Sequence, residues 1–113
     1  MTHQVYELII YSTEQGKEPF SEWLDNLEFV DATRVDTRLE RIVKGNFGEY
    51  KHLFEDVYEL KFKNHSGFRI YYGLDGNKII LLLNAGNKST QRRDIQKAKI
   101  YWNKYKERKN EKI

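Results

Sequence analysis

The sequence predicts an α+β domain: a small twisted, mainly antiparallel sheet packed by an αα-hairpin, in the order β-α-α-β-β-β-α. Three observations predict it. The first half contains two neighbouring segments with a helical period of apolar residues. The second half changes to a period of two across tight turns, which makes consecutive strands antiparallel. One of these strands is apolar on both faces, as expected of a strand that is covered on each side. With 113 residues, the chain has the length of a single domain, which we place at residues 1–113.

The N-terminal half is expected to fold as strand, helix, helix. The segment Val5–Tyr11 is β-branched and aromatic without an internal breaker, which is typical of a strand. Pro19 suits the first turn of a helix, because its missing N–H group has no helical partner there. Asp31 is expected to be the N-cap of a second helix, and Gly45 supplies its C-terminal stop. The apolar stripes of the two helices are Phe20, Trp23, Leu24 and Leu27, and then Val35, Leu39, Ile42 and Val43.

After a loop over Asn46–Asp56, the C-terminal half is expected to fold as three strands and a helix. The strands are Val57–Lys63, Phe68–Leu74 and Lys78–Ala85. Asp75-Gly76 is a hairpin signal between the last two. Ser89 or Thr90 is expected to cap the helix, whose apolar stripe is Ile95, Ala98, Trp102 and Tyr105. The tail over residues 106–113 is charged and is expected to fray.

Composition excludes several classes of protein. The chain has no cysteine, so it has no disulfide, thiolate metal site or cysteine nucleophile. Its longest apolar run, Ile79–Leu83, is far shorter than the roughly 18 residues of a membrane span, so we expect no membrane partner. The first residues lack the basic and apolar regions of a secretion signal, and we therefore expect a cytoplasmic protein.

The charge is distributed unevenly along the chain. The net charge is +3, but residues 1–60 hold 6 basic and 13 acidic residues, and residues 61–113 hold 14 basic and 4 acidic ones. The two parts therefore carry −7 and +10. Such an asymmetry indicates a polyanionic partner for the second part. The alternative is a solvated, lysine-rich C-terminal helix that binds nothing.

The segment Gly86–Thr90 lies between a predicted strand and a predicted helix. It is not a Walker A phosphate loop, because position 81 is leucine where that motif needs glycine. Free backbone N–H groups at the start of the helix, with Lys88 and Arg92 or Arg93 nearby, are suited to hold one phosphate. The alternative is a capped helix that carries a surface lysine.

No metal ion or cofactor is expected. His3, His52 and His65 lie far apart without the spacing of metal ligands, and no G-x-S-x-G motif marks a nucleophile. His65 follows the basic strand in a turn, where it is either an acid–base group or an ordinary surface histidine.

The most informative constellation is a set of cations on the predicted sheet. Lys61 and Lys63 share the polar face of one strand, and Arg69 lies on the polar face of the next, with Tyr71 two residues further on. The last strand leads directly to Lys88. Basic side chains with interleaved aromatic rings suit an RNA backbone and its unstacked bases. Fixed cations also stabilise the charge that develops when the RNA's own 2′-hydroxyl attacks a phosphate. The alternative is an ordinary solvated sheet face, although Arg69 lies between core residues, where a cation needs a partner.

The same residues carry a resemblance to a known family. The segments concerned are Tyr58–Phe62, Ser66–Tyr72, Leu81–Gln91 and Asp94–Ala98. With these motifs at this spacing, nearly the whole chain resembles the RelE/ParE toxin superfamily of bacterial type II toxin–antitoxin modules. Within that superfamily it is most similar to the HigB-like, phage Gp49-related branch. The resemblance implies a RelE-like fold, which agrees with the predicted order of elements.

The resemblance implies a toxin that a cognate helix-turn-helix antitoxin holds inactive and that, when free, binds in the ribosome and cleaves mRNA. It assigns catalytic contacts with the scissile phosphate to Lys61, Arg69 and Lys88. The RNA-binding residues expected around them are Lys63, Tyr71, Gln91, Arg92 and Arg93. Some relatives carry a tyrosine or histidine near Asp94–Gln96, where this chain has neither, so the general base is unassigned.

Two other functions remain open at this point. One is a ParE-like inhibitor of DNA gyrase without ribonuclease activity, and the other is a catalytically silent interaction domain. For either toxin we expect an acidic antitoxin segment to cover the basic sheet face, because opposite charges are complementary.

Overall fold

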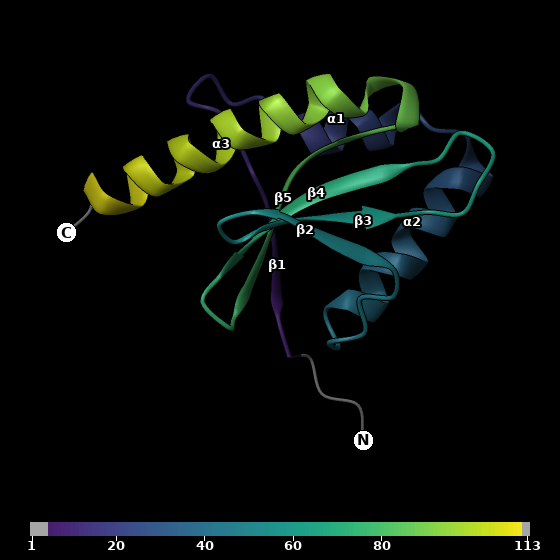
Figure 1. Ribbon diagram of the computed structural model, residues 1–113, viewed down its shortest axis with the longest axis horizontal. Coiled ribbons are helices and arrows are strands. Elements are labelled where there is room, and N and C mark those ends of the chain that lie inside the picture. Colours follow the sequence, from purple (N-terminus) through teal and green to yellow (C-terminus); the bar gives the residue numbers. More distant parts are fainter. Residues whose placement is uncertain (1–4, 112–113) are drawn as a thin grey trace.

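The computed structural model describes residues 5–111 (Figure 1). Its strands are β1 (Glu7–Ile10), β2 (Tyr50–Phe54), β3 (Val57–Lys61), β4 (Arg69–Asp75) and β5 (Ile79–Gly86). Its helices are α1 (Pro19–Asp25), α2 (Phe29–Ile42) and α3 (Gln91–Glu111), and a single 3₁₀ turn, Lys88–Thr90, precedes α3. The strands form one sheet in the order β1-β5-β4-β3-β2, with β1 parallel to β5 and all other neighbours antiparallel. The predicted α+β fold class is confirmed.

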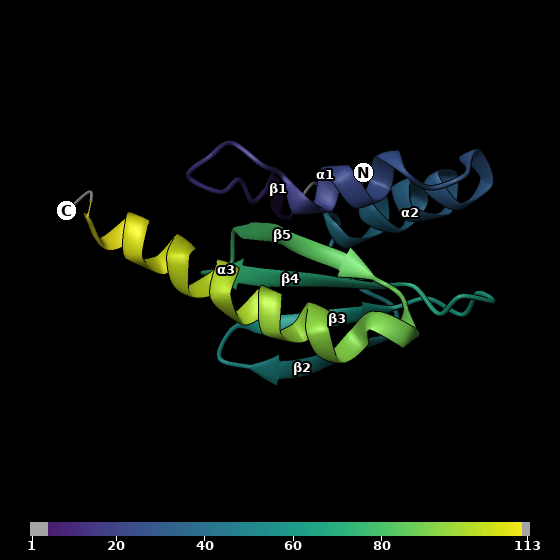
Figure 2. The same ribbon diagram turned by 90° about the horizontal axis from the view of Figure 1, so that it is seen from above.

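Helices cover both faces of the sheet, as Figure 2 shows. The αα-hairpin of α1 and α2 lies on one face, where Phe20 packs in a core that includes Ile80 and Leu82 of β5. α3 lies on the other face, where its Trp102 packs in a second core that includes Leu81 and Leu83. Successive residues of β5 therefore enter different cores, which explains why the sequence of this strand is apolar throughout.

The close approach of α3 to the sheet depends on Gly73 in β4. A Cβ atom at this position would lie 2.4 Å from Cζ3 of Trp102, so a side chain here would displace the indole. Trp102 is itself buried, and loss of a buried tryptophan side chain typically costs about 3–5 kcal/mol. This contact holds α3 over β4 and so positions the first turn of the helix near the end of the sheet where β4 begins.

The expected loop over residues 46–56 is wrong in part, because it contains β2. This strand pairs with β3 in antiparallel register and forms one edge of the sheet. Its first three residues, Tyr50, Lys51 and His52, are exposed, so the strand lacks the alternation of buried and exposed residues that reveals a strand in sequence. A tight turn with a positive φ of 43° at Glu55 connects β2 to β3.

The predicted start of the second helix is also corrected. α2 begins at Phe29 and its N-cap position is Glu28, with no side-chain cap among the described residues. Asp31 lies instead in the first turn, where a carboxylate interacts favourably with the helix dipole. By contrast, α1 begins at Pro19 as predicted, and α2 ends shortly before Gly45, whose φ is 90°.

The expected fraying beyond residue 105 is not what the structure shows, because α3 continues through Glu111. Lys106 pairs with Glu55, Lys109 pairs with Asp75, and the guanidinium of Arg108 donates to the Ser12 carbonyl. These contacts attach the end of the helix to the sheet and to the loop after β1. Residues 112–113, like His3, lie outside the described part of the chain. Within residues 5–111, no helix combines the length and apolarity needed to cross a membrane.

Candidate functional site

The structure brings Lys61, Arg69 and Lys88 together at one end of the sheet. Lys61 lies opposite Arg69 in the β3–β4 register, and Arg69 lies opposite Gly86 in the β4–β5 register, just before Lys88. At Gly67 in the turn between β3 and β4, a Cβ atom would lie 3.3 Å from both Arg69 Nη1 and Lys88 Cβ. Lys88 is exposed and Lys61 is half-buried. We call these three side chains the cation cluster.

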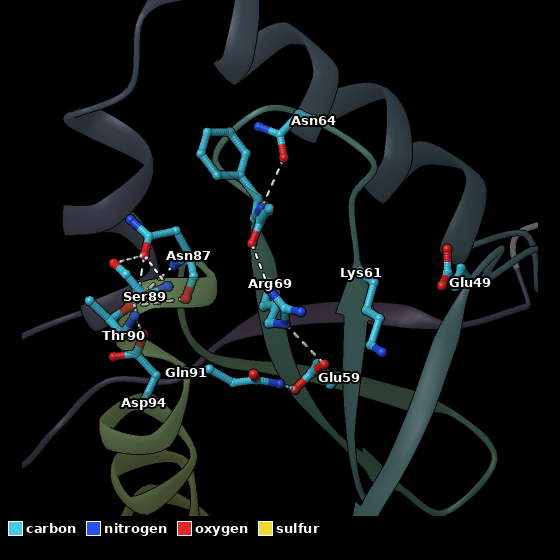
Figure 3. Close-up of polar contacts among 12 residues, drawn as sticks. Glu49, Glu59, Lys61, Asn64, Arg69, Asn87, Ser89, Thr90, Gln91 and Asp94 are labelled. Carbon is cyan, nitrogen blue, oxygen red and sulfur yellow. Dashed lines mark hydrogen bonds and ion pairs between the residues drawn. The ribbon is translucent and has the colours of Figure 1, made fainter.

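The protein itself fixes the Arg69 guanidinium within the cluster (Figure 3). Its Nε lies 3.3 Å from Oε1 of Glu59 in an ion pair, and its Nη1 donates a 2.9 Å hydrogen bond to the Gly67 carbonyl. The Arg69 side chain is 16% exposed, whereas that of Glu59 is completely buried, at 0%. This pairing explains how a cation is tolerated between the core residues of β4, because each charge offsets the desolvation of the other.

A second contact connects Glu59 to the start of α3. Gln91, the first residue of this helix, donates from Nε2 to Oε2 of Glu59 at 3.0 Å. Figure 3 shows the two side chains reaching toward each other from the helix and the sheet. The amide that we expected to contact RNA is therefore engaged by a buried carboxylate.

The turn before α3 is a helix cap. Asn87 Oδ1 accepts hydrogen bonds from the N–H groups of Ser89 and Thr90 at 2.9 and 3.3 Å. In return, Thr90 Oγ1 accepts the Asn87 N–H at 3.2 Å, which completes a capping box. The prediction that Ser89 or Thr90 is the cap is thus wrong, and Asn87 occupies backbone N–H groups that we expected to bind phosphate. What the turn offers to an anion is the exposed ammonium of Lys88.

Tyr71 does not lie where we expected it. We predicted an aromatic ring on an open sheet face, but α3 covers that face, and Tyr71 is 0% exposed within the core that includes Trp102. Burial, reinforced by the carboxylates of Glu59 and Asp94, raises the pKa of its hydroxyl. A base cannot stack on this ring in the structure as it stands, so the predicted RNA contact by Tyr71 is withdrawn.

The remaining predicted RNA-binding residues lie apart from the core of the cluster. Arg92 and Arg93 are exposed on the first turn of α3, next to Gln91 in the chain. Lys63 is exposed beyond the end of β3, where it lines a groove along α2 together with Arg34 and Arg41 of that helix. Lys63 and Lys61 therefore do not share one polar face as predicted, because β3 ends at Lys61 and its alternation ends there too.

Two residues that position the site were missed by the sequence analysis. Glu59 was not among the predicted site residues, although the need of Arg69 for a partner was a signal for it. Arg38 was not among them either, but from α2 it donates 2.7–3.1 Å hydrogen bonds to the carbonyls of Phe47, Glu49 and Lys61. Burial lowers the pKa of this guanidinium. Arg38 thus holds the end of β3 at Lys61, and no local pattern in the sequence indicates this.

A metal centre finds no support in the described residues. Among residues 5–111, no group of three or more histidine, aspartate or glutamate side chains is placed to hold a metal ion.

Comparison with known proteins assigns the family. The sequence model of the family described as "Phage derived protein Gp49-like (DUF891)" matches residues 22–106, which include all of the cation cluster. The chain belongs to this family. The Gp49-like family in turn belongs to the RelE/HigB-like toxins, so membership suggests a toxin of a toxin–antitoxin module and an antitoxin as partner.

This Gp49-like protein is also similar to a protein of Haemophilus influenzae strain Rd that carries the name "Uncharacterized protein". The two are 34% identical over 82 residues, which cover 72% of this chain and 83% of the relative. The relative's name adds nothing about activity.

Proposed function

We propose that this Gp49-like protein is the toxin of a type II toxin–antitoxin module and acts as a ribosome-dependent mRNA endoribonuclease. The observation that carries the proposal is the cation cluster, in which a lysine on β3, a fixed arginine on β4 and a lysine after β5 meet at one end of the sheet. Family membership supports the toxin role, and the cluster supports the chemistry. Translation would be inhibited because the message is cut while it is bound in the ribosome.

The cluster suits cleavage by the RNA's own 2′-hydroxyl. That oxygen would form a new bond to the adjacent phosphorus while the bond from phosphorus to the 5′-oxygen breaks, leaving a cyclic phosphate and a 5′-hydroxyl end. Negative charge increases on the non-bridging oxygens as this happens, and fixed N–H donors stabilise it. Arg69 would supply that stabilisation, and Lys61 and Lys88 would hold the phosphate.

Two protons also move in this reaction, from the 2′-hydroxyl to a base and from an acid to the 5′-oxygen. His65 is exposed in the turn between β3 and β4, next to Ser66, whose carbonyl oxygen lies 3.4 Å from the Lys88 backbone nitrogen. Because this turn adjoins Lys88, we select His65 for a test as acid or base. The Tyr71 hydroxyl is buried and is not available for this role.

Affinity for the ribosome would come from the wider basic surface. Arg92 and Arg93 extend the exposed positive charge from the cluster along the first turn of α3. Lys63 would contact a different stretch of backbone beside α2. Because each neutralised phosphate releases counterions, binding to RNA should weaken steeply as the salt concentration rises. The expected antitoxin would inhibit by placing acidic residues on the cluster, in the cytoplasm, where both proteins would meet the ribosome.

The proposal is tested by mapping mRNA 5′ ends by primer extension after the protein is induced, with a gyrase supercoiling assay in parallel. We expect discrete new ends with the wild type and at least about a hundredfold less cleavage with Arg69→Ala, the loss typical of a transition-state donor. Lys44→Ala is the control, because Lys44 is exposed in the turn after α2, outside both the cluster and the groove that Lys63 lines. Intact mRNA together with poisoned gyrase would show a gyrase inhibitor instead. Intact mRNA with active gyrase would favour the interaction domain.

A further inference from the structure

Glu59 has a cost to folding that its contacts must offset. It lies on β3, its side chain is 0% exposed, and it faces the core beneath α3. A buried ion pair is often no more stabilising than apolar residues of the same size. Stability alone therefore gives no reason to place a carboxylate here, at the rim of a cluster that would bind an anion.

The contacts of Glu59 point to a positioning role. One carboxylate oxygen, Oε1, faces Arg69 Nε at 3.3 Å, and the other, Oε2, accepts from Gln91 Nε2 at 3.0 Å. A single carboxylate thus connects β3 to β4 and to the first residue of α3. The geometry at Nε is that of an ion pair and not of an aligned hydrogen bond, and neither Nε nor Oε1 has another partner in the described chain.

The consequence for Arg69 is a guanidinium with a fixed orientation. Its Nε edge faces Glu59 and its Nη1 donates to Gly67, whereas Nη2 makes no hydrogen bond to residues 5–111. The side chain is 16% exposed, so the two N–H groups of Nη2 and the second N–H group of Nη1 are left for a ligand. Donors held in place before the reaction stabilise a transition state without reorganising.

The charge of Glu59 has an opposite effect on simple binding. It neutralises Arg69 in the free protein and repels any phosphate that approaches. A protein that needed only affinity for RNA would do better without this carboxylate. Orientation of Arg69 and affinity for RNA should therefore respond in opposite directions when the charge is removed.

We propose that Glu59 is a positioning residue that holds Arg69 in the orientation for phosphate cleavage, with Gln91 holding the carboxylate in turn. The expected loss of kcat rests on the proposed ribonuclease function. The fixed orientation of Arg69 does not rest on it, because this orientation is a property of the free protein. Removal of the Glu59 charge lowers kcat while affinity for RNA stays the same or increases.

The variants are Glu59→Gln, which keeps the size and the possible hydrogen bond to Gln91, and Glu49→Gln as the matched control. Glu49 is exposed and belongs to the segment before β2 that Figure 3 shows beside Lys61. Its substitution therefore removes one negative charge near the cluster without changing a contact of Arg69. For Glu59→Gln we expect kcat to fall by about tenfold to a hundredfold, the range that small misplacement of a catalytic group produces. The dissociation constant for a short RNA should not increase. The Glu49 variant should keep the wild-type kcat.

A structural measurement separates this inference from the ribonuclease proposal. In nitrogen-15 NMR of the free wild type, the Arg69 Nε–H signal should be protected from solvent exchange, unlike that of exposed Arg92, and Glu59→Gln should remove the protection. An Arg69 side chain as mobile as Arg92 in the wild type would overturn the inference, even if RNA is cleaved. Protection without any cleavage would refute the ribonuclease proposal and leave the positioning intact.

A folding defect must not be mistaken for a kinetic one. If Glu59→Gln does not give the cooperative thermal unfolding of the wild type, Gln91→Ala provides the test, since it removes one hydrogen bond and leaves the ion pair. It should lower kcat by several-fold at unchanged RNA affinity. A loss of RNA affinity that accounts for the whole loss of cleavage, in either folded variant, would contradict the positioning role.

Discussion

Arg38 gives the most direct test of how the site is held in place. Its guanidinium donates to the carbonyls of Phe47, Glu49 and Lys61 and lies 4.8 Å from the centre of the Phe62 ring. Replacement of Arg38 by methionine keeps much of the apolar stem but removes every one of these donors. The end of β3 then loses its hydrogen bond to α2.

The expected loss of stability follows from the number of carbonyls that lose a donor. At about 1 kcal/mol net for each hydrogen bond, the three acceptors of Arg38 together give about 3 kcal/mol. For a chain of 113 residues, a loss of this size lowers the Tm by about 12 °C. The carbonyl of Lys61 lies at the cation cluster, so RNA cleavage should fall as well, through a less ordered Lys61.

The assay compares Arg38→Met with Arg34→Met by urea and thermal unfolding followed by circular dichroism. Both residues lie on α2, but the Arg34 side chain is 49% exposed, and its one ion pair within residues 5–111 is the 3.9 Å contact with Asp31. Its replacement should therefore change stability by less than about 0.5 kcal/mol. Equal effects of the two substitutions would refute the reasoning. So would an Arg38 variant as stable as the wild type.

Three further predictions concern the packing around α3. Tyr71→Phe should leave RNA cleavage unchanged and stabilise the fold by about 1 kcal/mol, because the hydroxyl is buried without a partner among residues 5–111; destabilisation in urea would show that a partner exists. Gly86→Ala should cost about 3 kcal/mol by overpacking, since the new Cβ would lie 1.9 Å from an oxygen of Asp94; a variant with the wild-type Tm would show that Asp94 can move away freely. Hydrogen bonding by Lys109, and then by Tyr105, lowers the pKa of Asp75, so the stability that this carboxylate contributes is present at neutral pH and lost as the pH falls through that lowered pKa. Asp75→Asn should therefore destabilise the protein at neutral pH and not in strong acid, and a pH-independent effect on urea unfolding would contradict this.

The elements that the sequence predicted well are those in which one face of a local segment is buried. α1 begins at Pro19, and α3 carries its apolar stripe at the predicted positions, with Ala98 and Trp102 buried. The hairpin between β4 and β5 also forms as expected, because Gly76 accepts the positive φ of 63° that the turn requires. The edge strand β2 was missed because its first residues are exposed, so burial leaves no period in them.

The candidate site, like the fold, was predicted only in part. The types of residue in the cation cluster could be recognised from the sequence, because a cation between core residues of a strand is unusual wherever the strand lies. The contacts that these side chains make with other parts of the chain could not be recognised from the sequence. Alternation along β4 correctly predicted that Arg69 and Tyr71 lie on the face opposite the αα-hairpin. It also predicted that this face is open to solvent, which is wrong at Tyr71, because α3 covers that part of the face.

By itself, therefore, the sequence determined the class of fold and the two-sided burial of β5, and it predicted a site at Lys61, Arg69 and Lys88. Only the tertiary structure decided that Tyr71 is buried, that Asn87 rather than a phosphate takes the first N–H groups before α3, and that Glu59 holds Arg69. The physical reason is the separation along the chain of the residues that interact. Periodicity is a local property of a segment, and it shows which of its residues share a face. The identity of what covers the face depends on how a helix more than thirty residues away, beginning at Gln91, crosses the sheet over Glu59.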